Sequence, residues 1–454
     1  MDVDEQPRPD MGEFEDEFED EFESEDEILE AGVDGRPDAE REAEEKSAMD
    51  VDGGTGPGTF IVGRTKLEPG QILSPDPTTY DMLHSLTTPW PCLSFDIVRD
   101  SLGDNRKVYP ATMYAVAGTQ AESTRTNENQ IMVMKFSGLS KMDKGDAGDS
   151  DSDDDDDDED ADPILESKSI PLTSTTNRIR VHQSPASEAS RPPTALTATM
   201  TESAKVFIHD ITPHLASFDT PGSVVTTQQN KPLSTIRAHK SEGYAVDWQP
   251  SNLHPLGRLM TGDNDGLMYM TTRTDGGGFV TDTRPFAGHA GSVEDIQWSP
   301  SEASVFASAS SDGTVRVWDI RSKSRAAALS IKISETDWKP AAAGGGGKAA
   351  ASTSSTPIAS FSYHKEQITS IEWHPTDDSI MAVAAGDNTV TLWDLAVELD
   401  DEESRDTAGV QDVPPQLLFV HYHENAKELH WHPQIPGTLV ATGNEFSVFK
   451  TISV

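Results

Sequence analysis

Short runs of alternating apolar and polar residues recur along residues 90 to 454, separated by turns rich in Asp, Asn and Gly. Such runs are typical of antiparallel strands, because successive side chains of a strand point to opposite faces. Two stretches, 288 to 320 and 363 to 395, match in register. In each stretch a His precedes a Trp by nine residues, an Asp by 23 and a second Trp by 29. The matching residues are His289, Trp298, Asp312 and Trp318, and His364, Trp373, Asp387 and Trp393.

A third unit begins at His239 and reaches Trp248 nine residues later, with Asp265 and Gly266 as its turn pair. Units of about 40 to 50 residues that end in Trp-Asp are typical of propeller blades. We therefore predict an all-β fold, a β-propeller of WD repeats. The His, a strand Ser or Thr, the turn Asp and the strand Trp can form one hydrogen-bonded chain that locks a blade. This structural role is expected for His239, His289, Asp312, Trp318, His364, Asp387 and Trp393.

Degenerate units complete the ring. Residues 90 to 136, 177 to 211 and 427 to 454 are each expected to supply one blade. Residues 59 to 64, "TFIVGR", are expected to close the ring as an outer strand beside the C-terminal strands. Residues 76 to 87 have Pro77 near their start and apolar residues at three-residue steps, which favours a short helix on the propeller edge.

One blade is incomplete in the sequence. His239 and His289 are 50 residues apart, whereas His289 and His364 are 75 apart, too long for one unit and too short for two. Residues 326 to 333 and 357 to 362 both resemble outer strands, but no three inner strands lie between them. We predict six full blades plus a remnant, with an irregular segment over residues 338 to 356. A blade reduced to one outer strand would expose the apolar flanks of both neighbours, so we expect a lost exon or a misread gene model rather than a natural six-bladed ring.

Charge divides the chain into an acidic arm and hinge, residues 1 to 58, and the propeller, residues 59 to 454. The arm is expected to be disordered by itself, because residues 1 to 52 hold 24 acidic residues against four basic ones. Residues 141 to 163 form an acidic loop insertion, and residues 338 to 356 a low-complexity one. The formal net charge of −44 disfavours direct binding of nucleic acid and points to a strongly basic partner.

Cys92 is the only cysteine, which excludes an internal disulfide and fits a reducing compartment. No apolar run approaches the ~20 residues that span a bilayer, so we expect a soluble protein, a monomer, without membrane contact. No nucleophile, base and orienting group form a recognisable motif, and we expect neither an enzyme nor a cofactor. Four histidines near the C-terminus do not by themselves make a metal site, and none is expected. They are His421, His423, His430 and His432.

Candidate partner contacts fall into two groups. In the arm, Phe14, Phe18 and Phe22 recur at four-residue spacing and would share one face if the segment became helical on contact. Such rings would add apolar or Arg-stacking contacts to charge capture, unless they are incidental to a solubilising tail. In or beside the blade loops, five carboxylates are candidates for a basic client. They are Asp247, Asp263, Glu294, Asp295 and Glu372.

Several stretches together resemble one family, the glutamate-rich WD-repeat proteins. They are "CLSFDIVRDSLGDNR" (92 to 106), "AGTQAES" (117 to 123), "QLLFVH" (416 to 421), "KELHWHP" (427 to 433) and the closing "FKTISV". Members of this family have a complete blade where this chain breaks, and its fungal members are ribosome-assembly factors. The resemblance implies that the family fold has seven blades, from which this chain departs between Asp337 and Trp338, and that the protein is a dedicated chaperone of the nucleus and nucleolus, also found in the cytoplasm. Such a chaperone captures the newly made third protein of the large ribosomal subunit and delivers it to pre-60S particles.

Two alternatives remain open. The opening Trp90 to Leu93, "WPCL", is similar to that of the histone-binding WD proteins of chromatin assembly, which would make histones the partner. "WDIR", residues 318 to 321, resembles the box with which WD proteins dock on cullin ubiquitin-ligase adaptors, and it would make the chain a substrate receptor.

The basic extensions of ribosomal proteins are neutralised by RNA once assembled, and an acidic arm could stand in for that RNA beforehand.

Overall fold

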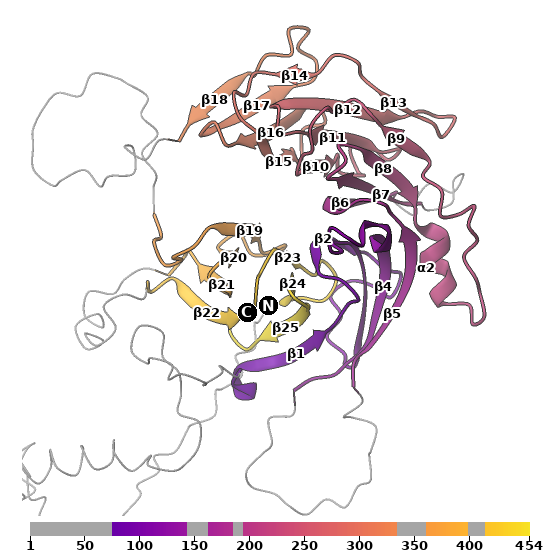
Figure 1. Ribbon diagram of the computed structural model, residues 1–454. Helices are drawn as coiled ribbons and strands as arrows, with labels where there is room; N and C mark the ends of the chain where they lie inside the picture. The colour runs from indigo at the N-terminus through magenta and orange to yellow at the C-terminus, as the bar shows by residue number, and fades with distance from the viewer. Residues whose placement is uncertain (1–74, 143–161, 185–193, 334–359, 398–413) are drawn as a thin grey trace, which may run out of the picture. The chain divides into compact units, whose positions relative to one another are not determined.

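The computed structural model describes residues 75–142, 162–184, 194–333, 360–397 and 414–454. All of them belong to the compact unit Gly63–Val454, whereas the other unit, Met1–Val62, lies outside the described residues. Within these ranges the chain forms six antiparallel sheets of four or five strands. Figure 1 shows them following one another along the chain as the blades of a WD-repeat β-propeller.

The first three blades in chain order come from residues before the matched repeats. The first contains β2 (Cys92–Val98), β3 (Ala111–Thr119), β4 (Gln130–Leu139) and β5 (Ile164–Pro171). The second contains β6 (Thr176–Gln183), β7 (Ala195–Thr201), β8 (Val206–Asp210) and β9 (Ser234–Ile236). The third contains β10 (Ala245–Trp248), β11 (Arg258–Gly262), β12 (Leu267–Arg273) and β13 (Phe279–Thr281), and β14 (Phe286–Ala287) also pairs with β12.

The remaining blades follow the same pattern. The fourth contains β15 (Val293–Trp298), β16 (Val305–Ser310), β17 (Thr314–Asp319) and β18 (Leu329–Lys332). The fifth contains β19 (Ile368–Trp373), β20 (Ile380–Ala385), β21 (Thr389–Asp394) and β22 (Leu417–Tyr422). The sixth contains β23 (Glu428–Trp431), β24 (Thr438–Thr442), β25 (Phe446–Thr451) and β1 (Tyr80–Leu86). Among the described residues, η1 (Pro77–Thr79) is a short helical turn directly before β1, and the short helices η2 (Thr126–Glu128) and α2 (Thr212–Phe218) lie between strands.

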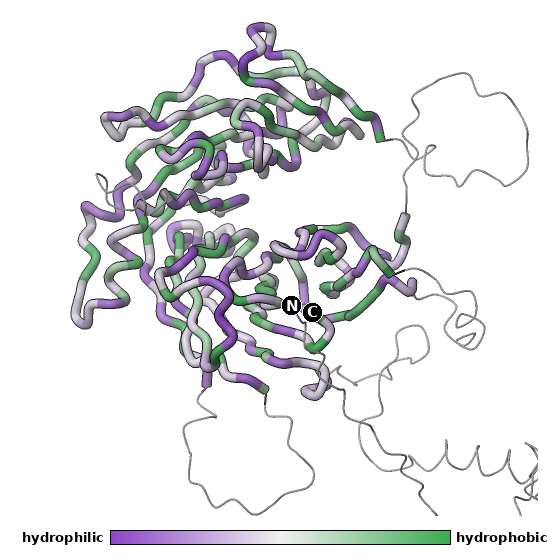
Figure 2. Tube along the Cα trace, turned by 180° about the vertical axis from the view of Figure 1, so that it is seen from behind, coloured by the Kyte–Doolittle hydropathy of each residue, from purple (hydrophilic) through white to green (hydrophobic). Residues whose placement is uncertain are grey.

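The predicted blades are present. The three degenerate units supply the strands β2–β4, β6–β8 and β23–β25, and β5 and β9 complete the first two blades from residues outside the predicted units. The expected outer strand within residues 326 to 333 is β18. Hydrophobic positions recur along the strands of the blades and hydrophilic ones along many of their connections (Figure 2). The alternation read from the sequence therefore reflects the burial of these strands.

Ring closure differs from the prediction. The strand that pairs with β25 is β1, antiparallel, from Tyr80 opposite Thr451 to Leu86 opposite Phe446. The proposed closing strand, residues 59 to 64, lies outside the described residues, and the closing position is taken by a segment that begins at Tyr80. The two chain ends do share a blade, but through residues 80 to 86.

The predicted helix over residues 76 to 87 is wrong. Pro77–Thr79 form only one 3-10 turn, capped by the Asp76 carboxylate, which accepts the backbone N–H of Thr78 at 3.0 Å. The chain then extends as β1, in which Tyr80, Met82 and Leu86 are buried and the residues between them are mostly more exposed. The pairing with β25 satisfies the backbone of this segment more completely than an isolated helix on the edge would.

Among the described residues the core consists of five hydrophobic clusters, and each lies between two sheets. They join the fifth blade to the sixth, the sixth to the first, and then the first, second, third and fourth in succession. Trp298, Phe306 and Trp318 fill the cluster between the third and fourth blades, where Phe306 stacks on Trp318 at a ring-centroid distance of 6.1 Å. Packing of face on face is thus what holds successive blades together.

The acidic and low-complexity insertions lie mostly outside the described residues. The acidic one connects β4 to β5, two neighbouring strands of the first blade. The other lies between β18 and β19, and the predicted irregular segment over residues 338 to 356 is wholly outside the described ranges. Of the proposed outer strand at residues 357 to 362, Ser360, Phe361 and Ser362 are described, and they form no strand.

Candidate partner-binding surface and the inner-strand network

Two of the described blades contain the full hydrogen-bonded chain expected from the repeat residues, and a third contains it without the Trp. In the fourth blade, His289 Nδ1 lies 3.0 Å from Asp312 Oδ2, and its Nε2 lies 2.7 Å from Ser308 Oγ. Trp318 Nε1 donates to the same hydroxyl at 2.8 Å. These contacts tie the entry loop, two strands and the β16–β17 turn together.

The fifth blade repeats the arrangement with one change. His364 Nδ1 lies 3.0 Å from Asp387 Oδ2, and its Nε2 lies 2.8 Å from Thr391 Oγ1, on the third strand of the blade. Trp393 Nε1 donates to Thr391 Oγ1 at 2.7 Å. The hydroxyl can therefore come from either of two adjacent strands.

Asp263 is a structural residue of the third blade, and its burial leaves it unable to contact a partner. It is completely buried, and its Oδ2 lies 2.7 Å from Nδ1 of His239, which also contacts Thr261 Oγ1 at 2.7 Å. Asp263 thus holds the position in the third blade that Asp312 holds in the fourth. The sequence pointed to Asp265 as the turn residue, because Asp265 is followed by Gly266 as Asp312 is by Gly313. Asp263 follows His239 by 24 residues, one more than the 23 residues from His289 to Asp312.

Asp247 also has an internal partner. Its Oδ2 accepts the backbone N–H of Trp298 at 2.6 Å, which links β10 to the inner strand of the next blade. Burial raises the pKa of Asp247 to about 8, against the lowering effect of the Trp298 N–H and of Arg180. A partly buried carboxyl with this pKa carries little charge near neutral pH, so Asp247 is a poor electrostatic contact for a basic client.

The other three candidate carboxylates are accessible. Glu294 and Asp295 are exposed on β15, where Glu294 accepts the hydroxyl of Ser292 and Asp295 Oδ1 accepts the backbone N–H of Ile296 at 2.9 Å. Glu372 on β19 is about one third exposed and its Oε2 lies 2.8 Å from Nδ1 of His430. These three side chains can still meet a basic partner.

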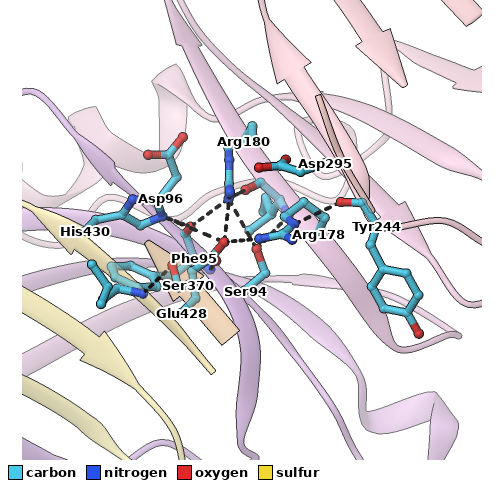
Figure 3. Close-up of polar contacts among 12 residues, drawn as sticks. Ser94, Phe95, Asp96, Arg178, Arg180, Tyr244, Asp295, Ser370, Glu428 and His430 are labelled. Atoms are coloured by element: carbon cyan, nitrogen blue, oxygen red, sulfur yellow. Dashed lines mark hydrogen bonds and ion pairs between the residues drawn. The ribbon is translucent and has the colours of Figure 1, made fainter. Parts of the chain in front are cut away.

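A network of charged side chains joins the inner strands of the fifth, sixth, first and second blades, and Figure 3 labels all of its members except Glu372. We call it the inner-strand network; it consists of Asp96, Arg178, Arg180, Glu372, Glu428 and His430. Its centre is Glu428, which is almost completely buried. Glu428 accepts from Arg178, from Arg180 at 2.8 Å and from the backbone N–H of Phe95 at 2.8 Å. One carboxylate thus binds groups from two neighbouring blades.

The pKa shifts in this network follow from burial opposed by opposite charges. Burial alone would raise the pKa of Glu428, but Arg180 and Arg178 lower it well below its usual range. Burial would lower the pKa of Arg180, but Glu428 and Asp96 raise it. Burial would also lower the pKa of His430, and the nearby Glu372 raises it instead. Glu428 therefore stays ionised and His430 is held closer to its charged form.

The sequence reasoning missed this network, although a signal was present. Arg178 and Arg180 alternate along one predicted strand, and Glu428 and His430 alternate along another, so each pair shares a face. Inner strands of a blade are covered on both faces, so paired charges there require partners. Which strands would meet could not be read from the sequence, because Arg178 and Glu428 are 250 residues apart.

The remaining candidates are placed as follows. His421 contacts the hydroxyls of Tyr80 at 2.9 Å and Ser447 at 3.0 Å. Within the described ranges no group of three or more His, Cys, Asp or Glu is arranged to hold a metal ion, and no helix there is long and apolar enough to cross a membrane. In the "WDIR" box Arg321 is exposed and its Nη2 lies 2.6 Å from Asp319 Oδ2. Phe14, Phe18 and Phe22 lie outside the described residues.

Two family models match the chain. Residues 281–319 and 355–394 match the WD domain, G-beta repeat, which agrees with the fourth and fifth blades. Residues 71–140 match the model for histone-binding protein RBBP4 or a subunit of the CAF1 complex. The second match covers the closing strand β1 and most of the first blade. The fold and these repeats define a WD-repeat β-propeller protein.

Three curated relatives extend along most of the chain. The ribosome assembly protein rrb1 of Schizosaccharomyces pombe is 43% identical over 469 aligned positions, which cover 98% of this chain and 94% of the relative. Protein HEAT STRESS TOLERANT DWD 1 of Arabidopsis thaliana is 39% identical, covering 86% and 91%. Glutamate-rich WD repeat-containing protein 1 of Dictyostelium discoideum is 37% identical, covering 86% and 84%. The chain belongs to this family of glutamate-rich WD-repeat proteins.

Proposed function

We propose that this protein is a ribosome biogenesis factor, a chaperone that binds a newly made basic protein of the large ribosomal subunit and delivers it to pre-60S particles. The observation that carries the proposal is the 43% identity with a ribosome assembly protein over 98% of the chain. At this identity and coverage a shared role in assembly is the simplest account.

The charge of the chain supports a basic client. The chain has 79 acidic and 35 basic residues, and the first 52 residues contribute 24 of the acidic ones. A ribosomal protein is built to bind the RNA phosphate backbone, and its basic extensions attract any polyanion before assembly. An acidic arm would occupy those extensions and would keep them from non-specific RNA.

The contact residues follow from exposure. Glu294, Asp295 and Glu372 are the accessible members of the carboxylate set, and we propose them as client contacts on the propeller. Phe14, Phe18 and Phe22 are proposed to add aromatic contacts from the arm. Carboxylates give long-range but salt-sensitive attraction, and the rings would slow dissociation once the client is bound.

A chaperone of this kind would bind its client soon after the client is synthesised in the cytoplasm and would release it at particles in the nucleolus. We therefore propose that the protein acts in the nucleus and nucleolus and also in the cytoplasm, as a monomer that binds one client. The experiment is purification of the tagged chain from its own cells at moderate salt, followed by mass spectrometry. The proposal expects one large-subunit ribosomal protein to dominate, together with pre-60S components.

Histone binding is the second candidate, and one specific observation favours it. Residues 71–140 match the histone-binding family model, and this region supplies both β1 and the first blade. Dominance of histones in the same purification would favour this function over the first. Recovery of a cullin adaptor would instead favour a receptor role through Arg321, which is exposed beside Asp319.

A further inference from the structure

A group of basic side chains lies at the junction of the second and third blades, near the end of β10. The inner strands β6 and β10 lie side by side there (Figure 1). Nε2 of His182, in β6, donates to the main-chain oxygen of Pro255 at 3.1 Å, and the His182 ring packs against Trp248 at a centroid distance of 5.3 Å. The four residues that we call the basic cluster are His182, His254, Arg258 and Arg273.

The connection from β10 to β11 is held in one backbone conformation. The N–H of His254 donates to the Pro250 oxygen at 3.0 Å, and the N–H of Gly257 donates to the His254 oxygen at 3.1 Å. Gly257 has a φ of +102°, and a Cβ there would lie 3.2 Å from Cζ3 of Trp248, so glycine lets the connection pack this closely. The N–H of Arg273 donates to the Gly257 oxygen at 3.0 Å, which brings Arg273 beside the connection.

Two blades orient the guanidinium of Arg258. Arg258 is the first residue of β11, and its Nη1 donates to Oε1 of Gln249 at 3.2 Å. Gln249 is completely buried, and its Nε2 donates at 2.7 Å to the main-chain oxygen of Ala303, between β15 and β16 of the fourth blade. Because both ends of the Gln249 amide are engaged, the plane of the guanidinium is set before any ligand binds.

Arg258 lacks the carboxylate partner that several other arginines have. Arg106, Arg180 and Arg321 pair with carboxylates at 2.8, 2.8 and 2.6 Å. Within the described ranges Arg258 forms no ion pair, although it is partly buried, and burial lowers its pKa. A partly buried cation without a counter-charge is costly, so this position favours an anionic ligand.

The two histidines of the basic cluster have the same positive surroundings. Burial and then Arg258 lower the pKa of His254. Burial lowers the pKa of His182 against the effect of the Pro255 oxygen, and His254 and Arg273 lower it further. No carboxylate of the described residues is among the groups that shift these two pKa values, although the chain has a net charge of −44. The basic cluster is therefore a local positive region of an acidic protein.

Two nitrogen atoms of the basic cluster, Nε of Arg258 and Nδ1 of His254, are buried without a hydrogen-bond partner among the described residues. Nη1 of Arg258 is engaged by Gln249, which leaves Nε and Nη2 as the edge with which a guanidinium binds an oxyanion through two parallel hydrogen bonds. Native structures leave few buried polar groups unpaired, so these atoms call for an acceptor. Both residues are partly exposed, so a small ligand can approach them from solvent.

We propose that the basic cluster is a binding site for a phosphate group, as inorganic phosphate or on a phosphorylated side chain. Two oxygens of the group accept from Nε and Nη2 of Arg258, a third accepts from Nδ1 of His254, and Arg273 adds positive charge. A phosphorylated side chain carries a charge of about −1.5 to −2 and three acceptor oxygens, whereas a carboxylate carries a single charge on a pair of oxygens. The set of donors therefore suits a phosphate group better than a carboxylate.

The small size of the positive region favours a single phosphate group over a nucleic acid. At physiological salt, charges are screened over about 8 Å, so the neighbouring side chains rather than the net charge of −44 govern the binding of a small anion. A strand of RNA extends beyond that distance and meets the repulsion of other acidic residues. The basic cluster also lacks the row of Lys and Arg side chains that contacts with many successive phosphates require.

The basic cluster and the proposed client contact at Glu294 lie at opposite ends of neighbouring inner strands. Glu294 is near the start of β15, and this start lies beside the start of β10, because a Cβ on Gly262, the pairing partner of Ala245, would lie 2.8 Å from Cγ1 of Val293. The basic cluster instead follows the end of β10. A phosphate group bound there leaves the client contact accessible, so the site is a separate input to the protein.

The test titrates the full chain, without a client, with inorganic phosphate and with a short phosphoserine peptide in a calorimeter at physiological salt. We expect saturable binding of at least one of them, with a dissociation constant on the order of 1 mM or tighter, and the tighter of the two identifies the source of the phosphate group. The unphosphorylated peptide and a single-stranded RNA should bind far more weakly. Failure of both phosphate probes to saturate, or tighter binding of the RNA or of the unphosphorylated peptide, overturns the proposal.

Variants then locate the site. Arg258→Gln retains a polar side chain beside Gln249 but removes the charge, and it should weaken phosphate binding at least about tenfold. Arg237→Gln, the matched control, removes the same charge from an exposed position and should change the affinity less than about twofold. Equal weakening by the two variants overturns the proposal, because net charge alone would then attract the anion. If circular dichroism shows Arg258→Gln to be unfolded, His254→Ala decides, and an unchanged affinity in that variant overturns the proposal.

Discussion

A carboxyl oxygen of Asp247 accepts the backbone N–H of Trp298 at 2.6 Å, so a side chain of one blade holds the inner strand of the next. Asp96 makes the same contact with the N–H of Val181 at 2.7 Å. Asp247, a candidate partner contact in the sequence, and Asp96, which was not one, thus both link neighbouring blades.

Asp247 should make stability depend on pH in a defined direction. Burial raises its pKa from 3.8 to about 8 in the folded protein. Between these two values the folded state holds a proton that the unfolded chain has released, so the free energy of unfolding falls as pH rises through this range. Asp247→Asn keeps an acceptor for Trp298 but cannot ionise. Urea unfolding from pH 5 to pH 9 should show a decline smaller by at least ~1 kcal/mol in the variant, and parallel declines would contradict the prediction.

Asp312 should behave in the opposite way. Burial alone would raise its pKa, but Thr314, the Ala290 N–H and His289 lower it below the ordinary value of 3.8. Its contribution is therefore present above about pH 4 and is lost as pH falls further. We expect Asp312→Asn to lower the free energy of unfolding by about 1–3 kcal/mol at pH 7, with a smaller effect near pH 3. Glu302→Gln, at an exposed position nearby in sequence, is the control and should change little.

Glu428 should be the most sensitive residue of the inner-strand network. Glu428→Gln leaves Arg178 and Arg180 without their buried carboxylate, and breaking such a pair costs about 3–5 kcal/mol. Glu294→Gln removes one carboxylate from the exposed surface and should have almost no effect on unfolding. If chemical denaturation gave equal midpoints for the two variants, the network would not tie the first, second and sixth blades together.

Two variants of the acidic arm separate the effect of its carboxylates from the effect of its phenylalanine rings. Deletion of residues 1 to 52 removes 24 carboxylates and should slow client association and flatten its salt dependence. Replacement of Phe14, Phe18 and Phe22 by Ser keeps every charge and should speed dissociation, by about 1 kcal/mol or more for each well-buried ring. Surface plasmon resonance at several salt concentrations measures both rates. Unchanged dissociation in the Ser variant would leave the arm as a solubilising tail.

The sequence predicted the fold well where the evidence was local. The spacing of His289, Asp312 and Trp318 defines a blade whose hydrogen bonds the structure contains. It failed at β1, because Tyr80 and Leu86 fit a three-residue step as well as an alternation, and only the pairing with β25 decides between helix and strand. Tertiary pairing, not local preference, fixes this segment.

The candidate site was harder to predict than the fold. Asp247, Asp263 and Glu372 all stand near blade loops in the sequence, yet Asp263 is buried against His239 whereas Glu372 remains accessible. The position of a residue in the sequence does not indicate whether its side chain lies on the side of the strand that faces the neighbouring blade. Contacts such as Arg178 with Glu428 join segments 250 residues apart, so no local pattern reveals them.

The central claim is that the protein binds a basic large-subunit ribosomal protein through its carboxylates, and one competition measures it directly. The full chain is mixed at physiological salt with equal amounts of the purified third large-subunit ribosomal protein and of histone H3–H4, and the bound fraction is quantified. We expect the ribosomal protein to be retained in clear excess, and charge reversal at Glu294, Asp295 and Glu372 to weaken it at least tenfold, or about 1.4 kcal/mol. Preferential retention of the histones, or equal retention of both, would contradict the account.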